Sequence, residues 1–135
     1  MRRSRADIVI ANARDLGPTK DWPGWYVYVG RGNMRRRLAA SPLANPYVIG
    51  QRVDPALVPS SQELRCRTRD EAVEWYDDWL QTEIAHGRRG PEIEAELERM
   101  EAIYHRHGKL VLVCWCAPKR CHAGIIRGIL EDRFR

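Results

Sequence analysis

The sequence has few of the features that mark membrane, secreted or repetitive proteins. No apolar run approaches the ~20 residues of a bilayer-spanning helix, and the basic start lacks the apolar core and cleavage site of a signal peptide. No internal repeat, low-complexity stretch or change of composition divides the 135 residues. We therefore expect one small cytoplasmic domain over residues 1–135 that has no membrane partner, with residues 1–5 as a candidate disordered end.

Acidic residues are scarce outside one segment of the chain. Residues 1–69 carry 13 Lys and Arg against 5 Asp and Glu, and residues 108–135 carry 6 against 2. Residues 70–107 reverse this balance, with 4 against 11. A basic surface favours an anionic partner such as phosphate or nucleic acid. A solvated pair of helices packed beside basic loops explains the same pattern without a partner, and both interpretations stay open.

Hydrophobic patterning predicts both strands and helices. Short apolar or β-branched runs predict strands at 7–11, 25–29 and 109–114. Apolar residues at helical spacing, with capping residues and glycines at the ends, predict helices at 68–87, 91–108 and 122–134. This order of elements indicates a small α/β domain with a mostly parallel sheet and helices packed on it.

Three of the four cysteines lie in one segment, which reads Cys114-Trp115-Cys116-Ala117-Pro118-Lys119-Arg120-Cys121-His122. The segment joins the last predicted strand to the last predicted helix, and ligands collect at the carboxyl ends of strands in open α/β sheets. If the strand continues past its apolar residues, Cys114 and Cys116 project from the same face. Cys121 and His122 then fall at a helix N-terminus, where the helix dipole stabilises a thiolate.

A metal site is one interpretation of this segment. Thiolate and imidazole ligands suit zinc, and three cysteines with one histidine also suit an iron–sulfur cluster. The spacing differs from that of standard zinc fingers. The expected ligands are Cys114, Cys116, Cys121 and His122, with Cys66 able to replace one of them.

A reactive thiol is the second interpretation, and a purely structural role is the third. In the second, Cys121 is a nucleophile or acid/base group, with His122, Lys119 and Arg120 lowering its pKa. In the third, the cysteines are small apolar residues of a buried strand and its neighbours. The residues alone leave all three interpretations open.

A second constellation, Gly30-Arg31-Gly32-Asn33, directly follows the aromatic strand. Glycines let a backbone approach a ligand closely, and an arginine binds phosphate or carboxylate through two hydrogen bonds. A plain turn accounts for the same residues. Because parallel strands end at one edge, we expect a single cleft lined by Arg31, Asn45, Cys116, Cys121 and His122. Gly30 and Lys119 are further candidates for ligand binding.

Nucleic acid is an alternative partner. Arg35, Arg36 and Arg37 form a basic run suited to phosphate contacts. The sequence contains no recognised DNA-reading helix or aromatic RNA motif, which favours a solvated basic loop as the interpretation of this run.

The chain resembles a family of small phage and bacterial proteins known as domain of unknown function 4326. The resemblance covers roughly residues 26–130 and depends on Tyr28-Val29-Gly30-Arg31, on Leu43-Ala44-Asn45-Pro46-Tyr47, on a helix with Trp79-Leu80, and on Leu112 to His122. It implies a compact α/β domain that is often phage-encoded. It carries no established activity.

These observations lead to one main hypothesis and two alternatives. The main hypothesis is a cleft that binds a nucleotide-like or phosphate-bearing ligand, with Arg31 as the anion clamp. If the protein is an enzyme, Cys121 is the expected nucleophile and His122 its partner. The alternatives are a non-enzymatic zinc-bound module and a basic nucleic-acid-binding accessory protein.

Overall fold

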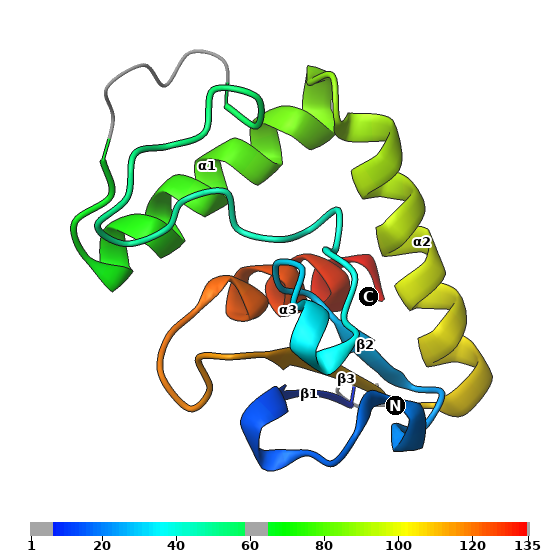
Figure 1. The fold of residues 1–135 in the computed structure, drawn as a ribbon. Helices are drawn as coiled ribbons and strands as arrows, with labels where there is room; N and C mark the ends of the chain where they lie inside the picture. The colour runs from blue at the N-terminus through cyan, green and yellow to red at the C-terminus, as the bar shows by residue number, and fades with distance from the viewer. Residues whose placement is uncertain (1–6, 59–64, 135) are drawn as a thin grey trace.

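A computed structural model describes residues 7–58 and 65–134 of the chain (Figure 1). The disorder expected at residues 1–5 falls outside the described residues. Three strands form one sheet in the described part: β1 (Ile8–Asn12), β2 (Tyr26–Tyr28) and β3 (Leu110–Cys114). Their order is β1-β3-β2, and both pairings are parallel.

The central strand is β3 because it is apolar along its whole length. Its sequence, LVLVC, is buried at every position except the partly exposed Val111. Strands covered on both faces are typically continuous runs of branched residues of this kind. Asn12 of β1 lies opposite Cys114, and Tyr28 of β2 lies opposite Val113. All three strands therefore end at the same edge of the sheet.

The described helices are α1 (Arg69–His86), α2 (Gly90–His107) and α3 (His122–Arg133). Thr68 caps α1, because its hydroxyl accepts a hydrogen bond from the Glu71 amide at 3.1 Å. Pro91 lies in the first turn of α2, and Gly108 ends that helix with φ of 74°. None of the helices in the described ranges has the length and apolar character required to span a bilayer.

The helices pack against the sheet and against one another. Figure 1 shows α3 between the sheet and α1, with α2 along one side. Contacts join α3 to β1 and β3, α2 to β3, and α1 to both other helices. The fully buried Tyr76 of α1 links these layers to the chain that follows β2, since its hydroxyl donates to the Leu43 carbonyl at 2.6 Å.

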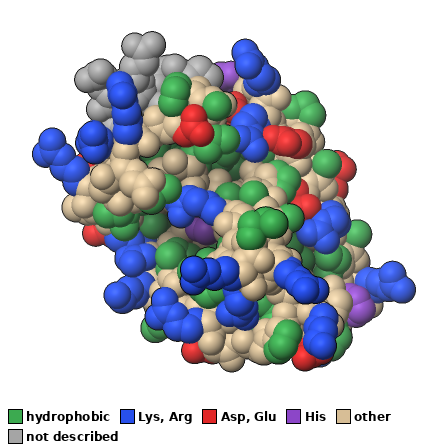
Figure 2. Space-filling model, viewed as in Figure 1, with side chains coloured by type: hydrophobic (Ala, Val, Ile, Leu, Met, Phe, Trp, Pro, Cys, Tyr) green, Lys and Arg blue, Asp and Glu red, His purple; other side chains and the backbone are tan. Residues whose placement is uncertain are grey.

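The structure confirms the predicted α/β class and the parallel sheet. The connection between β1 and β2, where no helix is predicted, contains two short 3-10 turns at 13–15 and 19–21. The acidic segment 70–107 coincides with the α1–α2 pair, as the solvated-helix interpretation expects. In Figure 2, most visible Asp and Glu side chains lie over these helices, while Lys and Arg gather over the lower half and one side.

Candidate functional site

A pocket of about 430 Å³ opens at the carboxyl ends of β2 and β3. Its walls come from the chain after each of these strands, from the loop at 45–49, and from the first turns of α1 and α3. This is the location at which open α/β sheets collect their ligands. The structure brings six of the predicted site residues around this pocket: Gly30, Arg31, Asn45, Cys116, Cys121 and His122.

The turn after β2 is shaped by Tyr28. Its hydroxyl donates to the Arg31 carbonyl at 2.5 Å and accepts from the indole nitrogen of Trp115 at 2.7 Å. A Cβ atom at Gly30 would lie 2.5 Å from the same hydroxyl oxygen. A side chain at position 30 would therefore displace the Tyr28 ring from the position in which these two hydrogen bonds hold it. The pair Tyr28–Trp115 also ties the chain after β2 to the chain after β3.

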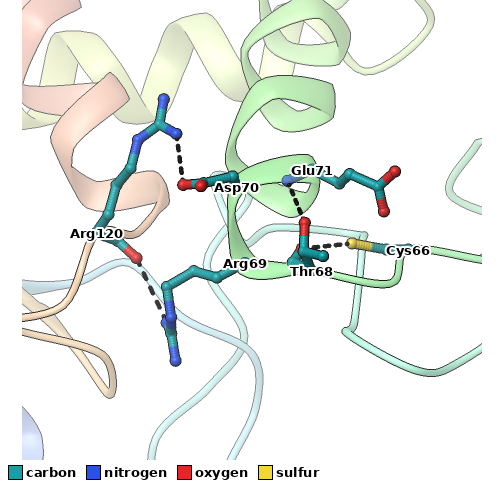
Figure 3. Close-up of polar contacts among 6 residues, drawn as sticks. All are labelled: Cys66, Thr68, Arg69, Asp70, Glu71 and Arg120. Atoms are coloured by element: carbon teal, nitrogen blue, oxygen red, sulfur yellow. Dashed lines mark hydrogen bonds and ion pairs between the residues drawn. The ribbon is translucent and has the colours of Figure 1, made fainter.

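Three arginines line the pocket, and two of them, Arg31 and Arg69, give it its positive charge. Arg31 donates to the Tyr47 carbonyl at 3.1 Å, and burial lowers the pKa of its guanidinium group. Arg69, the first residue of α1, donates to the Arg120 carbonyl at 3.4 Å, and Arg120 pairs with Asp70 at 2.8 Å (Figure 3). Within the described residues, neither Arg31 nor Arg69 pairs with a carboxylate. Both line the pocket without an acidic partner in the part of the chain that the structure describes.

Asn45 holds the wall of the pocket in place. Its amide nitrogen donates to the Ala72 carbonyl of α1 at 3.1 Å, and its amide oxygen accepts from the Tyr47 backbone at 2.9 Å. The residue is only 8% exposed. Both ends of this side chain are thus engaged in fixing the Asn-Pro loop against α1. The geometry gives Asn45 a supporting role beside the ligand-binding role that the sequence predicts.

The thiols of Cys114, Cys116 and Cys121 form a cluster beside the pocket. The Cys121 thiol donates to the Cys114 sulfur at 3.5 Å and also interacts with Cys116. All are free, and Cys116 is the half-buried one, whereas Cys114 and Cys121 are buried. Cys121 occupies the N-cap position of α3, at the predicted helix N-terminus, without a capping hydrogen bond from its side chain.

Within this cluster, Cys116 is the thiol that most readily carries the negative charge of a thiolate. The hydrogen bond from Cys121, followed by the guanidinium groups of Arg69 and Arg31, lowers the pKa of Cys116 to about 5 in spite of burial. The hydrogen bonds that Cys121 makes, together with burial, raise the pKa of Cys121. Cys114 also has a lowered pKa through the same donor, but adjacent thiolates repel each other, and the two arginines face Cys116. The sequence predicts Cys121 as the reactive thiol, whereas the geometry favours Cys116.

His122 belongs to the pocket lining but is almost fully buried. Its Nε2 atom lies 2.6 Å from the Val29 carbonyl oxygen, and its ring packs edge-on against Tyr76 with centroids 5.1 Å apart. Burial lowers the pKa of His122 to about 4, and the charge of Arg31 acts in the same direction. The ring is neutral at pH 7 and donates through Nε2 to the end of β2. This bond joins the start of α3 to the sheet, and no contact with the Cys121 thiol accompanies it among the described hydrogen bonds.

The predicted metal ligands do not form a metal-binding group in the described ranges. No set of three or more His, Cys, Asp or Glu side chains there is arranged to hold a metal ion. The imidazole of His122 is directed at Val29. Cys66 donates its thiol to the Thr68 carbonyl at 3.2 Å, and Figure 3 shows it across the first turn of α1 from Arg120.

The remaining predicted residues lie away from the pocket. Lys119 is exposed and does not line it. Arg35, Arg36 and Arg37 line a separate hollow with residues 16–20. Arg36 is engaged there with the carbonyls of Ala13, Leu16 and Gly17 at 3.1 to 3.3 Å, which leaves Arg35 and Arg37 as the exposed members of the run.

Sequence reasoning missed Arg69, Tyr28, Tyr47 and Trp115 as pocket residues. Arg69 had a usable signal, because it directly follows the predicted cap Thr68, and helix N-termini in α/β folds gather at the carboxyl edge of the sheet. The phenol of Tyr28 had no such signal. Its position depends on how the chain turns after β2.

Comparison with known proteins identifies one family. The family model for a domain of unknown function (DUF4326) matches residues 16–132. This range contains the whole pocket lining. Neither the curated proteins nor the solved structures include a match to the chain.

Proposed function

The chain belongs to the DUF4326 family, and from this premise we propose that its pocket binds a small anionic ligand, nucleotide-like or phosphate-bearing. The observation that carries the proposal is the charge of the lining. Arg31 and Arg69 line a pocket that has no Asp or Glu among its described lining residues, while Arg120, also in the lining, is paired with Asp70. A cationic cleft without carboxylates attracts anions and concentrates them.

The shape and the backbone of the pocket agree with this class of ligand. Its volume of about 430 Å³ falls in the range typical of small-molecule sites. The N-terminus of the 12-residue helix α3 opens on it through Cys121 and His122, and unpaired amides at such a terminus favour phosphate or carboxylate. Trp115 and Tyr28, both partly exposed, offer aromatic surface for a planar group beside the anion.

Loss of either unpaired arginine is expected to weaken binding. Arg31→Gln and Arg69→Gln should each reduce ADP affinity about 10- to 100-fold, because each removes one charge-assisted hydrogen bond worth roughly 1.5–3 kcal/mol. Isothermal titration calorimetry with ADP, adenosine and inorganic phosphate measures this effect. Adenosine should bind more weakly than ADP, and added salt should weaken ADP binding.

Lys119→Gln is the matched control. It removes one positive charge from an exposed side chain of the Cys114–His122 segment that does not line the pocket. It should leave ADP affinity within about 2-fold, because an exposed charge is well screened. The proposal fails if neither ADP nor phosphate binds. It also fails if ADP and adenosine bind equally well, or if Lys119→Gln weakens ADP binding as much as Arg69→Gln does.

The other interpretations stay alternative proposals. A nucleic-acid partner would use the exposed Arg35 and Arg37, and its binding would weaken steeply with salt while surviving loss of the thiols. A zinc-bound module would require a fourth ligand besides the three clustered thiols, and elemental analysis of the purified protein tests it.

The free thiols support a reducing cytoplasmic setting. We propose a phage origin solely from the resemblance in sequence to a family that is often phage-encoded.

A further inference from the structure

The three thiols of the cluster differ in how accessible they are from the pocket. Cys114 is 1% exposed and Cys121 is 7% exposed, while Cys116 is only half-buried and lines the pocket. The Cys121 thiol donates to the Cys114 sulfur at 3.5 Å, so both buried thiols are engaged with each other. Of the three sulfur atoms, that of Cys116 is the one best placed to meet a bound molecule.

The surroundings of Cys116 are those of an activated nucleophile. Cys116 lines the pocket together with Arg31 and Arg69. Its interaction with Cys121 lowers the pKa of this thiol, as do the charges of both guanidinium groups. A thiol that faces cations and accepts a hydrogen bond reacts as the thiolate, which is the nucleophilic form. The same two arginines face the pocket in which the anion is proposed to bind.

We propose that Cys116 is the nucleophile of the pocket and that it attacks electrophilic carbon in small anionic molecules held by Arg31 and Arg69. This inference rests on the proposed anion-binding function and adds a chemical role to the same site. In the step, the Cys116 sulfur forms a bond to the carbon while the bond from that carbon to its leaving group breaks. The leaving group departs with the electron pair, and no oxidant or reductant takes part.

A pair of alkylating reagents that differ in charge tests the proposal. Iodoacetate and iodoacetamide both transfer a two-carbon group to a thiolate and release iodide, but only iodoacetate is an anion. The rate constant for each reagent is measured on the full chain, and mass spectrometry of peptides assigns the modified cysteine. Glutathione, a thiol without a pocket, supplies the reference ratio of the two rates.

The expected result is fast modification of Cys116 with a preference for the anion. The ratio of the iodoacetate rate to the iodoacetamide rate should exceed that of glutathione by about 10-fold or more, since a charge-assisted contact is worth at least that factor. Arg69→Gln should return the ratio most of the way to the glutathione value. Lys119→Gln should leave it unchanged, and Cys116→Ser should abolish the fast phase.

Other outcomes overturn the inference. If Cys121 or Cys66 reacts faster than Cys116, or if the ratio equals that of glutathione, Cys116 is not a nucleophile for anions. Calorimetry with ADP on the same protein separates this failure from a failure of the proposed function. ADP binding with an unselective Cys116 rejects only the nucleophile. Selective carboxymethylation without ADP binding supports the nucleophile and rejects nucleotides as the ligand class.

Discussion

Replacing Tyr76 with alanine is expected to lower the free energy of unfolding by about 3–5 kcal/mol, the usual cost of removing a large aromatic side chain from a core. Tyr76 is fully buried and packs against the rings of Trp79 and His122. Its hydroxyl also donates to the Leu43 carbonyl at 2.6 Å. The substitution therefore leaves a cavity among α1, α3 and the chain after β2, together with a buried carbonyl that has lost this donor.

Urea denaturation followed by circular dichroism measures the loss, and Tyr76→Phe is the matched control. Phenylalanine keeps the ring and removes only the hydroxyl, so it should cost about 1–2 kcal/mol through the lost hydrogen bond. A loss below about 1 kcal/mol for Tyr76→Ala would contradict the packing described. Equal losses for the two variants would assign the whole effect to the hydroxyl.

Most of the fold could be predicted because its local signals agree with its packing. The run KLVLVC is apolar on both faces and becomes the central strand, and the predicted helix caps Thr68 and Gly108 occupy the ends of α1 and α2. The strand predicted at 25–29 is shorter in the structure, at Tyr26–Tyr28. Val29, the last residue of the predicted strand, still donates a backbone hydrogen bond to the Val113 carbonyl at 3.0 Å. The difference therefore lies only in where the strand is taken to end.

The location of the site followed from topology, whereas the roles within it did not. Parallel strands bring Arg31 and the Cys114–His122 segment to one edge, whatever the loops do. Which thiol carries charge depends on where Arg69 and Arg31 lie relative to each sulfur, within a few ångströms, and no spacing in the sequence gives that. Asn45 and His122 illustrate the same limit, because their polar atoms are directed at backbone groups of the fold.

Stability is expected to fall as the pH decreases from about 6.5 to about 4, through the burial of His122. Its pKa is about 4 in the folded protein against an ordinary 6.5. Between these values the unfolded chain binds a proton that the folded protein does not, so acid favours unfolding. The contribution of His122 to the free energy of unfolding is present in full above pH 6.5. It decreases by about 1.4 kcal/mol for each pH unit below that value, or roughly 3 kcal/mol in total.

His122→Gln isolates this contribution. The glutamine amide can donate to the Val29 carbonyl as Nε2 of His122 does, but it does not titrate, and the neighbours Tyr76 and Arg31 are unchanged. The hydrogen bond from Arg133 lowers the pKa of Glu94, so protonation of Glu94 in acid also lowers the free energy of unfolding. This effect is the same in the wild type and the variant. Urea denaturation at pH 7 and pH 4.5 should therefore give a drop that is roughly 2–3 kcal/mol smaller for the variant. Equal drops would contradict the prediction, because they would mean that His122 is protonated in the folded protein as readily as in the unfolded chain.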